Sequence, residues 1–372
     1  MYNDTRQNFG LTYNDEKNNM KSTFAYNSDR FRPGGDATTN TDLSSLNFDT
    51  QKAWNFRGGK DTLVGGVNFH QESYTQRYGA RQGNFDRDSY AAYVSYTNQL
   101  TDKFSATLGV REHFVIGNDY DQGQNIFLPQ LQTLYKINNN TSWYTNIGKS
   151  FELPASNSPF YGSGVVSTAI PLKPQEGWNY ETGMKFSNDK EMLKVAVFTM
   201  DIKNKFKWVR ENTVIPGGDP ATYIQINEDK FRNTGVELEY SKKINENWKF
   251  NFGAYYGNPE SKTGASEWKQ SEAKLQVNAG TTYKKDKWTV NMDWYVTAQR
   301  EQAYYNMIGT TAYSDHRVPD RIDCNVTMQY ALSPYKTIGF GVYNLLDREN
   351  PVDTTEYWSN PRSYRLSYTQ KF

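Results

Sequence analysis

The dominant feature of this sequence is an alternation of apolar and polar residues with a period of two. Between positions 275 and 294 the alternation continues through two segments, which are separated only by the turn KKDK (284–287). Successive side chains of a β-strand leave on opposite faces, so each such segment gives a strand with one apolar and one polar face. The terminal stretch RSYRLSYTQKF (362–372) repeats the pattern. We predict β-strands along the whole chain.

Short polar turns separate these alternating segments at regular intervals. There are eight, namely DEKN (15–18), RGGK (57–60), LTDK (100–103), NNNT (138–141), NDKE (188–191), INEN (244–247), KKDK (284–287) and SPYK (333–336). Longer connections rich in Gly, Pro, Asn, Asp and Tyr lie between them, for example GNDYDQGQN (117–125) and residues 300–316. Because tight turns and long loops alternate, we predict antiparallel hairpins with all long loops at one end of the strands.

This organisation predicts an all-β fold, a transmembrane antiparallel β-barrel. Tilted strands of about ten residues cross a bilayer, and outer-membrane barrels combine short periplasmic turns with longer extracellular loops. Eight tight turns join sixteen strands, and the C-terminal stretch adds a seventeenth. A closed barrel with both ends in the periplasm has an even number of strands, so we expect at least one strand upstream of this chain. A soluble β-propeller is the alternative, but it packs four short strands into the length that holds two long ones here.

The composition agrees with a barrel that encloses water. Only 36% of the 372 residues are hydrophobic, and the mean hydropathy is −0.86. Disordered chains share such polarity but are poor in aromatic residues, whereas this chain has 28 Tyr and 9 Trp. A polar lumen accommodates the polar groups, and aromatic residues near strand ends form interfacial girdles. Five tryptophans are expected in these girdles: Trp54, Trp143, Trp178, Trp248 and Trp288.

Several other classes of protein are disfavoured. The net charge of +1 gives no basic field for nucleic acid. The single cysteine, Cys324, excludes a disulfide framework, and its place beside Ile322 and Val326 predicts packing on the lipid-facing side. No run of about 18 apolar residues predicts a transmembrane helix, and the start lacks a secretory signal. No nucleophile, zinc or phosphate-loop motif is present, so neither an enzyme nor a cofactor is predicted.

Five features in order along the chain resemble the C-terminal half of TonB-dependent outer-membrane receptors. They are GKSFELPASNSPFYGSG (148–164), LKPQEGWNYETGMKF (172–186), FRNTGVELEY (231–240), GFGVYNLLDRENP (339–351) and the terminal Phe372. The resemblance covers most of residues 100–372. It implies a barrel of about 22 strands, a size class in which outer-membrane transporters carry a plug. Residues 1–372 then form one partial barrel domain, the last seventeen strands, without the plug, the TonB box and about five strands.

The resemblance also implies the location and partners of the protein. We expect a monomer in the cell outer membrane, in contact with membrane lipid and lipopolysaccharide and reached by the TonB complex through the missing plug. In this family the C-terminal aromatic pattern is a signal for the barrel-assembly machinery. Here its residues are Tyr364, Leu366, Tyr368 and Phe372, while Gln370 departs from the usual apolar residue.

The function that the resemblance implies is active, TonB-energised uptake of an iron chelate, with a ferric siderophore as the leading ligand. Cobalamin and other metal chelates are alternatives within the family, and a passive porin or an enzyme barrel are alternatives from other classes. Aromatic and cationic residues of the long loops could stack on and neutralise an anionic chelate. These residues are Arg77, Tyr78, Arg81, Phe160, Tyr161, Trp208, Arg210, Tyr304, Tyr305 and Trp358.

Metal and haem sites receive little support. The three histidines, His70, His113 and His316, are scattered, and the first two are expected on strands facing the lumen in hydrogen-bonding roles. Haem receptors of this family usually carry a histidine in the interval that corresponds to residues 155–172, where this chain has none.

The predicted loop GNDYDQGQN (117–125) has only a weak signature of a calcium site. Asp119, Asp121 and Asn125 have a spacing like that of calcium loops, but the completing acidic residue is missing, so a solvated turn is favoured.

Two further motifs have structural interpretations. We expect Gly183 and Gly235 to permit close approach of neighbouring strands, and residues 344–347 to end a strand.

Overall fold

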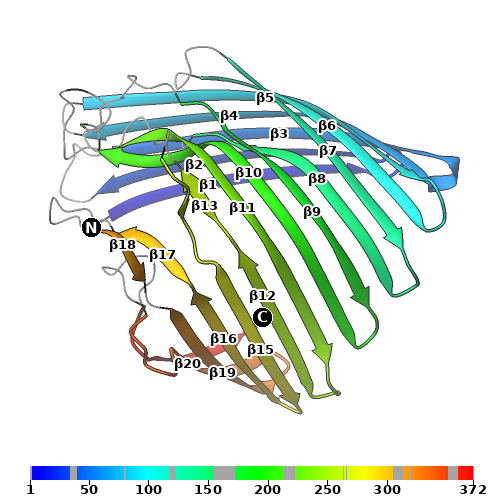
Figure 1. Cartoon of the computed structure of the whole chain (residues 1–372), viewed down its shortest axis with the longest axis vertical. Helices are drawn as coiled ribbons and strands as arrows, with labels where there is room; N and C mark the ends of the chain where they lie inside the picture. Colours follow the sequence, from blue (N-terminus) through cyan, green and yellow to red (C-terminus); the bar gives the residue numbers. More distant parts are fainter. Residues whose placement is uncertain are drawn as a thin grey trace. The chain divides into compact units, whose positions relative to one another are not determined.

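Long antiparallel strands make up almost all of the computed structural model (Figure 1). The structure describes residues 2–33, 40–78, 81–117, 123–154, 172–210, 212, 216, 223–262, 264, 266–304, 313–318, 320–350 and 359–371. Within these residues there are 21 strands and one 3-10 turn, η1 (Arg57–Gly59). None of the described helices is long and apolar enough to cross a membrane.

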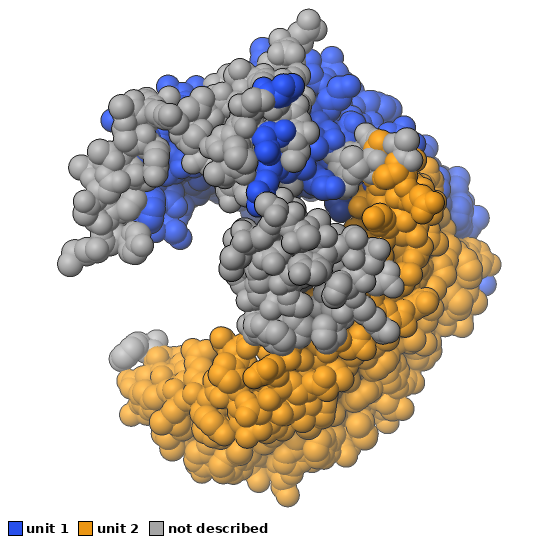
Figure 2. All heavy atoms as spheres, turned by 60° about the vertical axis from the view of Figure 1, so that its left-hand side comes forward, with its two compact units in different colours: residues 1–134, 146–179, 202–230 blue, residues 135–145, 180–201, 231–372 orange. Residues whose placement is uncertain are grey.

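The strands belong to two compact units, which Figure 2 shows in different colours. Unit 1 comprises residues 1–134, 146–179 and 202–230, and unit 2 comprises residues 135–145, 180–201 and 231–372. The strands wholly in unit 1 are β1 (Tyr2–Asp15), β2 (Met20–Pro33), β3 (Asn40–Phe56), β4 (Asp61–Tyr78), β5 (Arg81–Gln99) and β6 (Phe104–Gly117). The strands with residues in both units are β7 (Gln124–Lys136), β8 (Thr141–Glu152), β9 (Gln175–Ser187), β10 (Glu191–Arg210) and β11 (Tyr223–Lys243).

The remaining strands lie wholly in unit 2. The long ones are β12 (Trp248–Gly257), β15 (Leu275–Lys285), β16 (Trp288–Ala298), β19 (Arg321–Ser333), β20 (Lys336–Tyr343) and β21 (Ser363–Gln370). Two short hairpins join them, formed by β13 (Glu260–Lys262) with β14 (Lys269–Gln270) and by β17 (Arg300–Tyr304) with β18 (Tyr313–Val318). Seventeen described strands have at least eight residues, which is the number that the sequence pattern predicts.

All eight tight turns occur where the sequence predicts them. Each connects two long strands, as at 16–19 between β1 and β2 and at 286–287 between β15 and β16. An asparagine or threonine side chain closes several of these turns; for example, Asn245 Oδ1 accepts hydrogen bonds from the backbone N–H groups of Asn247 and Trp248, both at 2.9 Å. The connection that begins at residue 300 differs from the prediction of a plain loop, because β17 and β18 pair as an antiparallel hairpin.

In unit 1 one face of the sheet carries a continuous row of apolar side chains. The register of neighbouring strands places six of them side by side across β1 to β6: Leu11, Phe24, Phe48, Phe69, Tyr90 and Phe114. The ring centroids of Phe69 and Tyr90 lie 5.2 Å apart. We call the side of the sheet that bears this row the apolar face and the opposite side the polar face.

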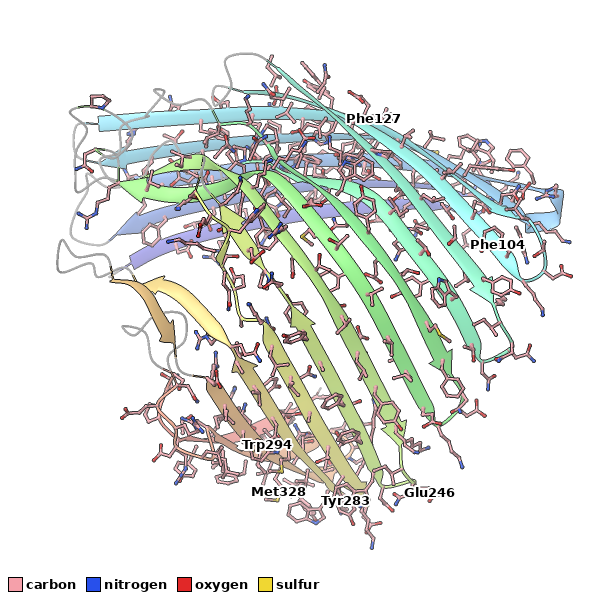
Figure 3. All side chains as sticks on the ribbon, in the orientation of Figure 1. Phe104, Phe127, Glu246, Tyr283, Trp294 and Met328 are labelled. Atoms are coloured by element: carbon pink, nitrogen blue, oxygen red, sulfur yellow. The ribbon has the colours of Figure 1, made fainter. Side chains whose placement is uncertain are left out.

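In unit 2 the same division holds, and side chains leave both faces along its strands (Figure 3). Met292 on β16 lies opposite Val326 on β19, which in turn lies opposite Val342 on β20. Their neighbours Asn291 and Thr327 point to the polar face, where the Asn291 amide donates to the Thr327 hydroxyl at 3.3 Å. The predicted alternation is therefore confirmed across three strands.

The five tryptophans that the sequence places in girdles are all exposed, each by more than a third of its surface. Trp248 and Trp288 begin strands directly after tight turns, and each packs against an aromatic residue of the neighbouring strand. The Trp248 and Tyr283 ring centroids lie 4.7 Å apart, and those of Trp288 and Tyr330 lie 4.6 Å apart. Aromatic residues thus gather at the tight-turn end of unit 2, where Figure 3 labels Tyr283.

Two glycines of the recognised motifs are required by close packing, as expected. A Cβ atom on Gly235 would lie 2.5 Å from the carbonyl oxygen of Tyr256 on β12. One on Gly183 would collide with the carbonyl oxygen of Val195 and would lie 2.9 Å from the Tyr144 hydroxyl. Both sites therefore accept only glycine without a shift of the backbone.

The segment after β20 corrects the prediction for Cys324. Strand β20 ends at Tyr343, and the backbone N–H of Leu345 then donates to the Cys324 carbonyl at 2.8 Å. Asn350, fully buried, brackets Ile322, because its Nδ2 donates to the Ile322 carbonyl at 2.9 Å and its Oδ1 accepts the Ile322 N–H at 3.1 Å. Cys324 shares the apolar face with Val326, as predicted, but its side chain is buried and has no surface exposed to lipid.

Candidate functional site

A cluster of buried polar residues lies on the polar face of unit 1, toward the long-loop ends of the strands. Strand β5 supplies its centre, because Phe85, Arg87, Ser89 and Ala91 alternate along it and all four are less than a tenth exposed. Their neighbours on the sequence point to the opposite face, as Tyr90 does with 47% exposure. Alternation on one strand therefore delivers a buried arginine to the polar face.

Arg87 is held by three sets of contacts. Its Nε donates to Glu72 Oε2 at 3.0 Å, and its Nη2 donates to the same oxygen. Its Nη1 donates to the carbonyl of Pro154 at 2.8 Å, and the guanidinium lies 5.1 Å from the Phe85 ring centroid. Glu72 lies directly opposite Arg87 in the β4–β5 register, which explains why the pair forms. This charge is paired and buried, so its role in the fold is structural.

Two histidines that the sequence leaves scattered come into this one cluster. His70 lies opposite Ser89, and His113 lies opposite Ala91, two residues further along β5. His70 Nε2 is 3.4 Å from Glu72 Oε1. The His113 ring packs on Phe151 with centroids 4.8 Å apart, and His113 Nε2 has no hydrogen-bond partner among the described residues. Both histidines lie on strands and on the polar face, as predicted.

A second arginine extends the cluster toward the middle of the strands. Arg111 Nη2 donates to Asn68 Oδ1 at 3.3 Å, and the guanidinium lies 5.5 Å from the Tyr93 ring centroid. The Tyr93 hydroxyl in turn donates to Asp49 Oδ1 at 3.3 Å, while its ring occupies the space left by Gly66. The polar face of unit 1 is thus lined with cations and aromatic rings that are already oriented by neighbours.

The backbone on both sides of the segment 155–171 is anchored in unit 1. On one side Arg87 binds the carbonyl of Pro154. On the other, Asn227 brackets Lys173: its Oδ1 accepts the Lys173 N–H and its Nδ2 donates to the Lys173 carbonyl, both at 2.8 Å. The two anchors fix where this long connection leaves and rejoins the strands.

Unit 2 has its own polar cluster in mid-strand. The Tyr144 hydroxyl donates to Glu181 Oε1 and lies over Gly183. Lys194 Nζ lies 3.9 Å from Glu181 and 3.7 Å from Glu239, so it bridges two carboxylates. These charges are also paired with one another.

The predicted ligand residues are only partly described. Arg77 and Arg210 have described side chains near the long-loop ends of β4 and β10, and Arg77 shares the face of Phe69. Tyr78, Arg81, Trp208 and Tyr304 belong to described strands, but nothing can be said of their side chains. The others lie outside the described residues: Phe160, Tyr161, Tyr305 and Trp358.

The predicted assembly signal and the candidate calcium ligands are also only partly covered by the described residues. Tyr364, Leu366 and Tyr368 point to the apolar face of β21 and are more than half exposed, whereas Phe372 lies outside the described residues. Asp119 and Asp121 also lie outside them. Across the part of the chain that the structure describes, no group of three or more His, Cys, Asp or Glu side chains could hold a metal ion.

The sequence interpretation missed the residues that build the unit 1 cluster, above all Arg87 and Arg111. A signal was present, since the stretch 85–93 places Phe85, Arg87 and Tyr93 on one face by alternation alone. Arginines and aromatic residues also occur in the long loops, so residue type alone did not distinguish the strand residues. The strand walls beside the loops also present cations and aromatic rings.

Long antiparallel strands with one apolar and one polar face define the class of transmembrane β-barrel proteins. The family model of the TonB dependent receptor-like β-barrel matches residues 1–345, and the chain belongs to this family.

Two curated relatives are similar over much of the chain. The vitamin B12 transporter BtuB of Photobacterium profundum is 23% identical over 367 residues, covering 97% of this chain and 56% of the relative. The ferric-pyoverdine BN7/BN8 receptor of Pseudomonas putida is 22% identical over 308 residues, covering 78% of this chain and 35% of the relative. The chain thus spans about half the length, or less, of these relatives.

A solved structure supports the fold. The siderophore receptor PirA from Acinetobacter baumannii aligns with a TM-score of 0.79 at 16% sequence identity, covering all of this chain and 63% of that one. At this identity the likeness concerns the fold alone.

Proposed function

We propose that the protein containing this chain takes up a metal chelate across the outer membrane with energy from the TonB complex, and that the chelate is a ferric siderophore. Membership in the TonB-dependent receptor-like family carries this proposal. It also favours an active receptor over a passive porin or an enzyme barrel. The plug, the TonB contact and the interaction with the barrel-assembly machinery remain parts of the proposal.

The polar face of unit 1 supports an anionic ligand. Arg111 and Tyr93 line it. The predicted loop residues Arg77 and Arg210 lie at the long-loop ends of β4 and β10, with Arg77 on the apolar face. Guanidinium groups and aromatic rings together suit an anionic, aromatic iron chelate. Cobalamin, named for one relative, is the second candidate ligand.

Uptake by cells tests the proposal. A receptor-deleted strain that expresses the natural coding region containing this chain should accumulate radioactive iron from a ferric siderophore and lose this uptake when TonB is disrupted. Growth that depends on cobalamin, without iron uptake, would replace the siderophore by the second ligand. Uptake that persists without TonB would overturn the proposal of active transport.

Binding measurements sharpen the assignment of residues. Replacing Arg77 or Arg210 by Gln should weaken binding of the ferric chelate by about two- to fivefold, the effect of one exposed ion pair. Lys60→Gln is the matched control, because Lys60 is exposed in a tight turn at the other end of β4. Equal losses in all three variants would contradict the assignment of the ligand site to the long-loop ends.

A further inference from the structure

On the apolar face of unit 2, the tight-turn ends of four neighbouring strands carry both aromatic rings and lysines. Lys285 on β15 lies directly opposite Trp288 on β16, and Trp288 lies opposite Tyr330 on β19. Lys287 occupies the turn between β15 and β16, and Lys336 begins β20. We call these five residues the girdle patch.

Strand register places the patch on the side of the sheet that contacts lipid. Lys285 is two residues from Tyr283 and shares its orientation, and Lys336 has the orientation of Ile338, which lies opposite Tyr330. The three lysines are exposed. Neighbouring strands lie about 4.8 Å apart, so the patch extends about 14 Å from β15 to β20. The lysines are therefore spread along the membrane boundary.

The charge of this end of the sheet is one-sided. The tight-turn ends of β15, β16, β19, β20 and β21, residues 283–290, 328–340 and 368–371, contain a single acidic residue, Asp286. The same residues contain five lysines: Lys284, Lys285, Lys287, Lys336 and Lys371. In the described part of the chain, no carboxylate forms an ion pair with a lysine of the girdle patch. The patch thus carries an unbalanced positive charge.

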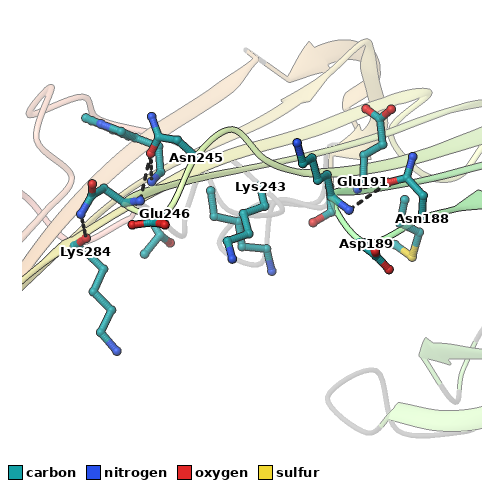
Figure 4. Close-up of a pocket in the computed structure, with 14 residues that line it drawn as sticks. Asn188, Asp189, Glu191, Lys243, Asn245, Glu246 and Lys284 are labelled. Carbon is teal, nitrogen blue, oxygen red and sulfur yellow. Dashed lines mark hydrogen bonds between the residues drawn. The ribbon is translucent and has the colours of Figure 1, made fainter.

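The adjacent groove of unit 2 has a different charge balance. Turns 188–191 and 244–248 line it, and the close-up in Figure 4 labels acidic and basic residues there: Asp189, Glu191, Glu246, Lys243 and Lys284. On β11 beside this groove, Lys242 Nζ lies 3.5 Å from Glu191 Oε2. The lysines at those turns therefore have several acidic neighbours in the chain, which the girdle patch lacks.

The girdle patch lies at the depth where a bilayer presents its headgroups. Tryptophan and tyrosine rings prefer this level, and the Trp288 and Tyr330 rings stack with centroids 4.6 Å apart. Lysine stems cover apolar surface while the ammonium group stays among the headgroups. The backbone beneath is fixed, because the Ala331 N–H donates to the Lys287 carbonyl at 2.9 Å. The ammonium groups are therefore held at headgroup level.

We propose that the girdle patch binds anionic phospholipid headgroups of the phosphatidylglycerol type. Charge complementarity carries the proposal, since lysines near an anionic membrane surface attract its phosphates and no carboxylate of the patch competes. A soluble acidic protein does not fit, because Trp288 and its neighbour Ile338 belong to the face that lipid covers. The inference goes beyond the uptake of a chelate and rests only on the position of the strands in the membrane.

The local lipid composition at the patch is measured in vesicles. The chain with Ile338→Cys is refolded into phosphatidylcholine vesicles and labelled with a small fluorophore, because Ile338 is exposed whereas the native Cys324 is buried. Nitroxide-labelled phosphatidylglycerol or phosphatidylcholine is added at equal mole fraction, and quenching is compared. Phosphatidylglycerol should be enriched about fivefold at the label, the effect of one lysine near the surface, and high salt should reduce the enrichment.

Variants of the lysines separate the patch from the net charge of the chain. The triple variant Lys285→Gln, Lys287→Gln, Lys336→Gln should lose most of the enrichment, whereas arginine at the three positions should retain it. The matched control removes three lysines from the polar face, which the sheet separates from lipid, and should leave the enrichment unchanged. This control is Lys243→Gln, Lys249→Gln, Lys284→Gln.

Heat-dependent mobility in gels checks that every variant is folded. Lys336→Gln alone is a milder second test, because Lys336 lies two residues from the label, and it should lose part of the enrichment.

Three results would overturn the proposal. One is equal quenching by the two lipids in the labelled chain with its lysines intact. Another is an equal loss of enrichment in the two triple variants, which would assign the effect to net charge. The third is enrichment that persists in the variant of the girdle patch. The assay needs neither a chelate nor TonB, so its outcome is independent of the uptake experiment.

Discussion

Arg87 in unit 1 and Lys243 in unit 2 both lie on the polar face of the sheet, but their surroundings differ. Arg87 is 5% exposed and is bound by Glu72 and the Pro154 carbonyl, whereas Lys243 is exposed and faces another lysine. A buried charge with all its partners supports the fold and has no capacity left for a ligand. Among the residues that the structure describes, no carboxylate forms an ion pair with Lys243, and an exposed charge of this kind contributes little to stability.

The strongest test of this comparison breaks the buried pair. Arg87→Ala leaves the Glu72 carboxylate without its main partner, and loss of one member of a buried ion pair costs about 3 to 5 kcal/mol. Unfolding by urea of the protein refolded in detergent micelles measures the change. The triple variant Lys243→Gln, Lys249→Gln, Lys284→Gln replaces exposed lysines of unit 2 and should change stability by less than about 1 kcal/mol. Similar losses of unfolding free energy in the two variants would show that burial does not decide how much each charge contributes to stability.

The second test compares the two faces of one strand. Val326→Arg places a charge among Met292 and Val342 on the apolar face and should cost about 2 to 4 kcal/mol if the site lies near the middle of the bilayer. Gln329→Arg, on the polar face of the same strand, should cost much less. Refolding into lipid vesicles measures both, and an equal penalty would contradict the assignment of faces.

The smallest effect concerns the turns. The pKa of the Asp15 carboxyl is lowered, because the side-chain and backbone N–H groups of Asn18 donate to it. A lowered pKa adds stability at neutral pH, and this contribution disappears as the pH falls through that pKa. Asp15→Asn should therefore reduce the loss of stability between pH 7 and pH 3 in urea unfolding.

The tight turn at residues 188–191 of unit 2 gives the control for this pH effect. Asn188 Oδ1 accepts the backbone N–H groups of Lys190 and Glu191, both at 2.9 Å, without a titrating group. Asn188→Ala should lower stability equally at both pH values. An acid sensitivity of the Asp15→Asn variant equal to that of the unaltered chain would exclude the carboxyl as its source.

The regular part of the fold could be predicted from the sequence because strand periodicity and turn chemistry are local. The alternation around KKDK gave β15 and β16, and polar turn residues gave all eight tight turns. The short hairpin β17–β18 was missed, since its five- and six-residue strands lie in a region rich in turn-forming residues. The hydrogen bonds of Leu345 to the Cys324 carbonyl and of Asn350 to Ile322 join segments far apart in the sequence, which local patterns do not contain.

The candidate site was less predictable for a related reason. Residue type pointed to arginines and aromatics in the loops, but pairing depends on register between strands. Glu72 meets Arg87 because β4 and β5 align them, and Lys243 meets Lys249 because β11 and β12 do so. A single sequence gives the face of each residue more readily than its partner on the next strand.

The asparagines that bracket a residue of another segment have a consequence for how this protein can change. Asn227 closes on Lys173 and Asn350 on Ile322 through both the N–H and the C=O of the bracketed residue. These bonds reproduce strand pairing at the base of a connection without using any residue within it. The strands that flank residues 155–171 and 351–358 are therefore tied together by Asn227 and Asn350, so we expect their register to survive changes of sequence within those two segments.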